Sequence, residues 1–221
     1  MTTIRYEWIT FDCYGTLVDW EGGIAGAFLE AASEDGVRLE REDVLIAHAA
    51  IEPQVQAEHY RSYRSVLGQT ARLMGDRLGW RLPPDRSALL ADSLPEWNVF
   101  EDTNAALEQL VAAGYRLGIL SNVDDALLDG TRRQLRVPFD LLVTAERVRS
   151  YKPSHGHFLA ARERIGDAPW LHAAQSWFHD IEPAHALGIP SAWVNRKLEP
   201  RRGEAQPDLE VRDMRELARK L

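Results

Sequence analysis

Apolar and polar residues follow two different patterns along this chain, and the pattern changes near residue 20 and again near residue 97. The short run at residues 8–11 (WITF) is aromatic and β-branched, which predicts a buried strand. The run stops at Asp12, and Gly15 marks a turn in which the backbone favours positive φ. The chain therefore begins with a predicted strand that leads into a polar loop.

The segment from residue 20 to about residue 94 shows helical spacing of its apolar side chains and no convincing strand. Candidate helices run through Ile24 to Ala32, Val44 to Ala47 and Val66 to Met74, and Pro83 and Pro84 interrupt the pattern. We therefore expect an all-helical domain at residues 20–95, inserted into a core domain that comprises residues 1–19 and 96–221.

Beyond residue 97 the predicted helices and strands alternate. We expect helices at residues 104–113, where Gly114 serves as a C-cap, and at residues 157–165. Strands are predicted at residues 115–120, 141–144, 173–178 and 191–194. Such alternation is typical of an α/β fold with a doubly wound parallel sheet.

Polar side chains occur where the predicted strands end. Asp12, Ser121 and Asp180 each follow a candidate strand, and Lys152 follows the segment after another. Ligands of open α/β sheets bind beyond the carboxyl ends of the strands, so these side chains are expected to meet at one edge. A nucleophile, a hydroxyl, a cation and a supporting carboxylate in one place would form an active site.

The composition is that of an ordinary globular protein, with 45% hydrophobic and 27% charged residues among 221. The formal net charge of −8 argues against a broad surface for nucleic acid or membrane. The single cysteine, Cys13, excludes an intrachain disulfide and a cysteine-rich metal site. Residues 1–7 lack the apolar run of a signal peptide, and no stretch reaches the roughly 18 apolar residues of a transmembrane helix, so we expect a cytoplasmic enzyme.

Four short motifs, in this order, resemble those of the haloacid dehalogenase superfamily. They are residues 11–17 (FDCYGTL), residues 120–122 (LSN), residues 151–153 (YKP), and residues 179–180 (HD) followed by residues 186–188 (ALG). The resemblance covers nearly the whole chain. It implies a Rossmann-like core, and it identifies the helical insertion as a cap domain.

The resemblance also implies catalytic roles. Asp12 is expected to act as the nucleophile that forms an ester intermediate, which water then hydrolyses. Lys152 would hold Asp12 ionised and balance developing charge. Asp180 would either pair with Lys152 or position the hydrolytic water. Ser121 and Thr16 would orient the carboxylate or bind substrate oxygen.

The residue at position 14 bears on the choice of chemistry. Phosphatases of the superfamily carry a second Asp two residues after the nucleophile and a Gly-Asp pair in the fourth motif, whereas this chain has Tyr14, Ala174 and Gln175 there. Mg²⁺ prefers carboxylate oxygens, so the expected site is poor for it. Tyr14 instead matches the pattern of 2-haloacid dehalogenases, which need no metal because halide leaves without a proton.

We therefore expect metal-independent dehalogenation of a small anionic 2-haloacid, without a cofactor. The expected substrate-binding residues are Tyr14, Asn122, Ser176 and Trp20, with Asn122 near the leaving group. Three positions depart from well-known dehalogenases: the cap arginine is missing, an aromatic hydroxyl is replaced by Phe158, and an Asn is replaced by Trp177.

Other interpretations remain open at this point. A magnesium-dependent phosphatase and a non-catalytic member of the superfamily are the alternatives. The spacing of the 7 histidines does not match a helical zinc site, and His179 beside Asp180 is the most interesting of them. Dimers are common in the family, which makes a homodimer an expectation, but no sequence pattern specifies an interface.

Overall fold

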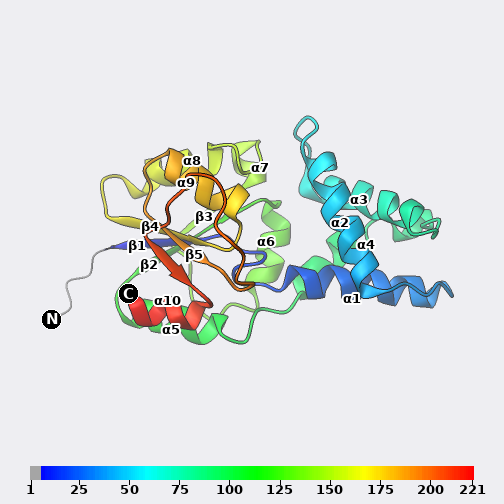
Figure 1. The fold of residues 1–221 in the computed structure, drawn as a ribbon, viewed down its shortest axis with the longest axis horizontal. Helices are drawn as coiled ribbons and strands as arrows, with labels where there is room; N and C mark the ends of the chain where they lie inside the picture. The colour runs from blue at the N-terminus through cyan, green and yellow to red at the C-terminus, as the bar shows by residue number, and fades with distance from the viewer. Residues whose placement is uncertain (1–5) are drawn as a thin grey trace. The chain divides into compact units, whose positions relative to one another are not determined.

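The computed structural model describes residues 6–221, which divide into two compact units. One unit is an α/β domain formed by residues 6–19, Val99–Asn122 and Arg133–Leu221, and the other is helical and formed by Trp20–Asn98 and Val123–Arg132 (Figure 1). The helical unit thus contains residues 123–132 and 96–98 in addition to the range expected from the sequence. We describe each unit separately.

The α/β unit contains a sheet of six parallel strands in the order β3-β2-β1-β4-β5-β6. The strands are β1 (Trp8–Phe11), β2 (Arg116–Ser121), β3 (Leu141–Thr144), β4 (Trp170–Ala174), β5 (Ser191–Val194) and β6 (Leu209–Val211). From β1 the chain adds β2 and β3 on one side of the sheet and then returns to add β4, β5 and β6 on the other side. The carboxyl end of β1 is therefore a topological switch point. Ligands of doubly wound sheets bind at such points. The doubly wound α/β fold is confirmed.

One predicted strand is placed wrongly and one is missing from the prediction. The strand expected at residues 173–178 ends at Ala174, and the apolar residues after it form a π-helical turn at Trp177–Ile181. The chain leaves the sheet there because the Ser176 side chain accepts a hydrogen bond from the backbone N–H of His179 and caps this turn. The missing strand is β6, a three-residue edge strand paired with β5.

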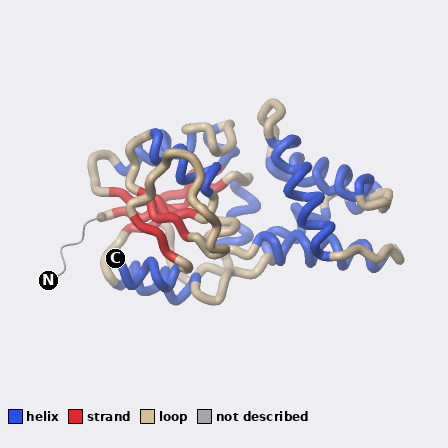
Figure 2. Tube along the Cα trace, viewed as in Figure 1, coloured by secondary structure: helices blue, strands red, loops and turns tan. Residues whose placement is uncertain are grey.

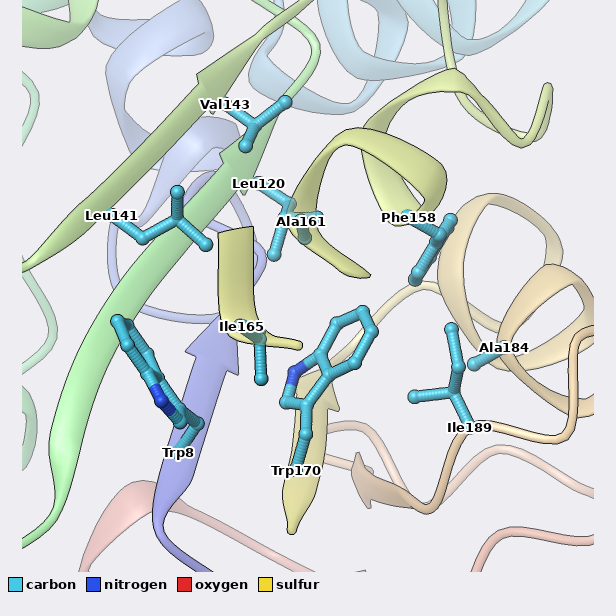
Figure 3. Close-up of a cluster of buried hydrophobic side chains, with 10 residues drawn as sticks. All are labelled: Trp8, Leu120, Leu141, Val143, Phe158, Ala161, Ile165, Trp170, Ala184 and Ile189. Carbon is cyan, nitrogen blue, oxygen red and sulfur yellow. The ribbon is translucent and has the colours of Figure 1, made fainter. Parts of the chain in front are cut away.

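Helices cover both faces of the sheet (Figures 1 and 2). One face carries α5 (Thr103–Ala112) and α10 (Met214–Lys220), and the other carries α7 (Ala145–Val148), α8 (Gly156–Ile165) and α9 (Glu182–Ala186). Under α8 and α9 a buried cluster joins the helices to the strands (Figure 3). In this cluster Phe158 of α8 and Trp170 of β4 lie among aliphatic side chains. Burial of this apolar surface fixes the helices on the sheet.

The helical unit is built from α1 (Trp20–Glu34), α2 (Arg41–Gln56), α3 (Tyr63–Arg77), α4 (Leu89–Ser93) and α6 (Asp125–Arg132), with short 3₁₀ turns at Pro84–Arg86 and Leu94–Glu96. Residues 123–132 belong to it because the Asp124 carboxylate accepts hydrogen bonds from the backbone N–H groups of Tyr63 and Arg64, each at 2.8 Å, at the start of α3. In the described part of the chain, residues 6–221, no helix is long and apolar enough to cross a membrane.

Candidate active site

The candidate nucleophile lies at the carboxyl end of the central strand of the α/β unit. Asp12 directly follows β1, and its backbone N–H donates to the carbonyl of Ala173 in β4 at 3.1 Å. The next residues turn sharply, and Gly15 has a φ of 102°, as its position in the sequence predicts. The turn brings Thr16 back to Asp12, so that the Thr16 hydroxyl donates to Asp12 Oδ2 at 2.9 Å.

The Thr16 hydroxyl is itself held in place. It accepts a hydrogen bond from the backbone N–H of Gln175 at 2.9 Å, which leaves its proton for Asp12. The Thr16 carbonyl accepts from the guanidinium of Arg196, at 2.7 Å from Nη2. Arg196 also forms a two-pronged pair with the Asp102 carboxylate, at 3.0 and 3.1 Å. The loop after β1 is therefore fixed from two sides, and the sequence analysis did not identify Arg196.

Lys152 is the cation at the centre of the site. Its side chain is 1% exposed, and Nζ donates to Asp12 Oδ1 at 3.0 Å, to Asp180 Oδ1 at 2.6 Å and to the Leu120 carbonyl at 2.9 Å. Burial lowers the pKa of Lys152, but the negative charges of Asp12 and Asp180 outweigh burial and raise that pKa above its ordinary value. The three donated bonds use all three ammonium protons. Lys152 is therefore a protonated, fully satisfied cation.

The two carboxylates that share Lys152 differ in their protonation. Burial raises the pKa of Asp12, and the neighbouring charge of Asp180 adds to this, while Lys152 opposes both without cancelling them. Burial also raises the pKa of Asp180, but Lys152 and the hydrogen bond from His172 lower it far more, so Asp180 is the more acidic carboxyl group. One carboxylate is thus firmly ionised, and the other is poised closer to neutrality.

Asn122 and His157 shape the backbone around Lys152. The Asn122 side chain donates to the Lys152 carbonyl at 3.0 Å and accepts from its N–H at 2.7 Å. His157 Nε2 lies 3.0 Å from the Ser121 carbonyl, and burial lowers the pKa of His157 to about 3, so the ring is neutral and donates this bond. The Ser121 hydroxyl is buried and has no hydrogen-bond partner among residues 6–221. It is therefore a hydroxyl that can donate to a bound ligand.

Three side chains that the sequence analysis missed lie behind Asp180. His172 Nε2 is 3.0 Å from Asp180 Oδ1, and His172 Nδ1 is 2.8 Å from the Thr10 hydroxyl. The indole N–H of Trp170 donates to the same Thr10 oxygen at 2.7 Å. The three missed side chains come from strands β1 and β4, which pair with Thr10 opposite His172. Strand pairing therefore determines the contact, and no short motif in the sequence marks it.

The predicted substrate-binding residues fall into different environments. Tyr14 is half-buried in the turn after Asp12, where it forms a bridge with Val18. The Ser176 hydroxyl contacts the ring of His179 as well as its backbone, at 3.1 Å each. Trp20 is the first residue of α1 in the helical unit, and its ring packs against His48 with 5.3 Å between centroids. Asn122 binds the backbone of Lys152, so the structure gives it a positioning contact.

The residues that replace the usual pocket groups are buried in aromatic contacts. Phe158 is fully buried and meets the ring of His172 edge to face, with 5.0 Å between centroids. Trp177 packs in the same manner on Trp193, at 4.8 Å. Among residues 6–221, no three or more His, Cys, Asp or Glu side chains come together in an arrangement that could hold a metal ion.

Comparisons with known proteins agree with this fold. A family model described as haloacid dehalogenase-like hydrolase matches residues 6–186. An (S)-2-haloacid dehalogenase of Pseudomonas fluorescens is 28% identical over 202 residues, which cover 85% of this chain and 83% of that protein. Haloacid dehalogenase-like hydrolase domain-containing protein 3 of Danio rerio is also 28% identical, over 88% of this chain and 87% of its own. The crystal structure of a defluorinating L-2-haloacid dehalogenase superposes with a TM-score of 0.84 at 22% identity, over 98% of this chain and 95% of that one.

The parallel sheet, with a buried carboxylate at its switch point, and these matches define an α/β hydrolytic enzyme. The chain belongs to the haloacid dehalogenase-like hydrolase family. It is a hydrolase of the haloacid dehalogenase type, as the sequence motifs imply.

Proposed function

We propose that this protein hydrolyses a small 2-haloacid to the corresponding 2-hydroxyacid, with Asp12 as a covalent nucleophile and without a metal ion. The observation that carries the proposal is the environment of Asp12. Lys152 Nζ contacts one of its oxygens and the Thr16 hydroxyl contacts the other, so the carboxylate is oriented and nine-tenths buried. An oriented and partly desolvated carboxylate is the form in which a modest nucleophile becomes effective.

In the first step a carboxylate oxygen of Asp12 attacks the α carbon of the substrate. The new C–O bond forms as the carbon–halogen bond breaks, and the halogen leaves with the electron pair as halide. No proton is needed at the leaving group, which suits a site with Tyr14 where a phosphatase would have an acid. The Ser121 hydroxyl, buried without a partner among the described residues, is available to donate to the substrate carboxylate.

In the second step water attacks the ester carbonyl carbon of Asp12, and Asp180 accepts a proton from that water. The tetrahedral intermediate then collapses, the bond between the carbonyl carbon and the alkyl oxygen breaks, and the proton passes to the departing hydroxyacid oxygen. Asp12 releases its remaining proton and returns to the carboxylate. Overall one water is consumed, and one halide and one proton are released. The low pKa of Asp180 keeps it ionised and able to accept this proton.

The substrate class rests on the relatives. Several curated relatives at 26–28% identity are named (S)-2-haloacid dehalogenases, and they are matched over most of their length. The departures at Phe158 and Trp177 alter the pocket, so a different halide or a bulkier acid is compatible with the same nucleophile. A magnesium-dependent phosphatase is less well supported, because Asp12 and Asp180 are both committed to Lys152 and Gln175 occupies the position of the metal-binding acid.

The test is halide release from 2-chloro, 2-bromo and 2-fluoro acids of both configurations, in EDTA, with Asp12→Asn as the matched control. Release by the native protein and none by Asp12→Asn is expected. Incubation in ¹⁸O-labelled water for a single turnover should leave the label in Asp12 rather than in the first molecule of product. Release that persists in Asp12→Asn would contradict the proposal. Turnover of phosphate monoesters only with added magnesium would favour the phosphatase instead.

A further inference from the structure

A continuous chain of hydrogen bonds runs through the interior of the α/β unit and ends at the nucleophile. It starts at the Trp170 indole, passes through the Thr10 hydroxyl and the His172 ring, and reaches Asp180 Oδ1. Lys152 then links Asp180 to Asp12. Thr10, His172 and Asp180 are each 0% exposed, so solvent does not compete with these bonds.

Two of the donors in this chain can be assigned from their chemistry. An indole N–H only donates, so the Thr10 oxygen accepts from Trp170 and directs its own proton elsewhere. An ionised carboxylate only accepts, so His172 carries its proton on Nε2 and donates it to Asp180. His172 Nδ1 shares a hydrogen bond of 2.8 Å with the Thr10 hydroxyl. His172 therefore bridges Asp180 and Thr10 through its two ring nitrogens.

The two oxygens of Asp180 are used unequally. Oδ1 receives two donors, from Lys152 at 2.6 Å and from His172 at 3.0 Å. Oδ2 is buried and has no hydrogen-bond partner among residues 6–221. A buried carboxylate oxygen without a donor is costly, which points to a ligand that supplies one. Two donors on Oδ1, from different elements, prevent the carboxylate from rotating to exchange its oxygens.

We propose that His172 is a positioning residue for the hydrolysis of the Asp12 ester: with Thr10 and Trp170 behind it, His172 fixes Asp180 so that Oδ2 stays available to accept a proton from the hydrolytic water. This proposal rests on the proposed function and adds a residue to it. His172 does not touch substrate. Phe158, which replaces an aromatic hydroxyl, packs against the His172 ring in an edge-to-face contact and limits its movement.

The proposal predicts that only the second step of the reaction depends on His172. Two substitutions of similar shape separate its two contacts. In His172→Gln the amide nitrogen reaches the position of Nε2 and keeps the bond to Asp180. In His172→Asn the shorter amide reaches only the position of Nδ1, so the bond to Asp180 is lost. Thr10→Val removes the hydroxyl that contacts His172 Nδ1, and Thr10→Ser restores it.

The experiment measures both steps in rapid-mixing single turnovers, with halide release for ester formation and intact-protein mass spectrometry for the Asp12 ester. In His172→Asn we expect halide release at the native rate and ester hydrolysis slower by about 10-fold to 100-fold, so that the ester accumulates. His172→Gln and Thr10→Ser should hydrolyse the ester within about threefold of the native rate. Equal slowing of both steps in His172→Asn, or no slowing of hydrolysis, would overturn the proposal.

A second measurement does not depend on the substrate. Carboxyl ¹³C NMR, with Asp180→Asn for assignment, follows the titration of Asp180 in the substrate-free protein. The pKa of Asp180 should rise by about 1 in His172→Asn and stay low in His172→Gln, because a donated hydrogen bond favours the ionised form. An unchanged pKa in His172→Asn would overturn the proposal. If the native protein forms no Asp12 ester with any acid, the proposed function fails, and this titration still decides the role of His172.

Discussion

The α/β unit and the helical unit each bury ionisable side chains, and they accommodate them differently. In the α/β unit Asp12 and Asp180 both lie within hydrogen-bonding distance of Lys152, so each carboxylate has an opposite charge beside it. In the helical unit His48 is 6% exposed and Glu52 is 8% exposed, one turn apart on α2, and neither forms an ion pair with another residue of the range 6–221.

The pKa values of the buried groups depend on whether an opposite charge lies close by. Burial lowers the pKa of His48 to about 4. Burial also raises the pKa of Glu52 to about 7, although hydrogen bonds from Tyr63 and Gln56 act against it. In the helical unit burial favours the neutral forms of His48 and Glu52, whereas in the α/β unit pairing favours the charged forms of Lys152 and Asp180. A paired arrangement can keep an ionised carboxylate in a dry site, which the proposed hydrolysis by way of an ester needs.

The largest expected effect comes from removing the shared cation. In Lys152→Met two buried carboxylates lose their partner, and we expect a loss of about 3–5 kcal/mol in the free energy of unfolding together with loss of activity. The loss should be greater at pH 8 than at pH 5, because protonation relieves an unpaired carboxylate at low pH. Urea unfolding at several pH values measures this.

Lys220→Met is the matched control for this prediction. Lys220 forms an ion pair with Glu216 at 3.0 Å on the surface of α10, where its side chain is 42% exposed. The same chemical change there should alter stability by less than about 0.5 kcal/mol. Similar losses of stability in the two variants would mean that the buried ion pairs of Lys152 stabilise the α/β unit no more than a surface ion pair does.

The sequence predicted some strands of the α/β unit correctly and missed others. Strands at Leu141–Thr144 and Ser191–Val194 were predicted at their observed bounds, because each is a short buried run between turn residues. The apolar stretch that begins at Ala173 misled the prediction, since a buried π-helical turn and a buried strand have the same composition. The edge strand Leu209–Val211 has only one buried residue and carries too weak a pattern to detect.

The sequence also predicted some residues of the candidate site and missed others. Asp12, Thr16, Lys152 and Asp180 belong to loops after strands, where polar residues interrupt apolar runs and form local motifs. The structure brings these four together. His172 and Thr10 lie inside strands, and their contact depends on the register of β1 against β4. Register is a tertiary property, which a single sequence without an alignment does not report.

An intermediate effect is expected from Glu52→Gln. The native pKa of Glu52 lies above its ordinary value of 4.5, at about 7. The contribution of Glu52 to the free energy of unfolding is therefore fully present below pH 4.5 and is lost as the pH rises to about 7. At about 1.4 kcal/mol for each pKa unit, the loss amounts to about 3 kcal/mol. Glu52→Gln should remove this dependence, so that the variant is more stable than the native protein at pH 8 and similar to it at pH 4.

His48→Phe should change the pH dependence of stability in the opposite direction. The pKa of His48 is below its ordinary value of 6.5, so its contribution is present above pH 6.5 and is lost as the pH falls to about 4. The Phe variant should therefore gain stability relative to the native protein at pH 4 and not at pH 8. Parallel pH curves for the native protein and both variants would show that burial does not control these two groups.

The smallest expected effect concerns Asp124, a carboxylate that the helical unit stabilises in a third way. Asp124 is 8% exposed, and its two oxygens accept from the backbone N–H groups of Tyr63 and Arg64, each at 2.8 Å. Free N–H groups at the start of a helix favour a negative charge, so the helix terminus takes the place of a cation. Asp124→Ala should cost about 1–2 kcal/mol, and Asp124→Asn, which keeps one acceptor oxygen, should cost less. Thermal unfolding of both variants at pH 7 tests the order. An Asn variant as unstable as the Ala variant would show that the charge of Asp124, rather than its geometry, joins residues 123–132 to α3.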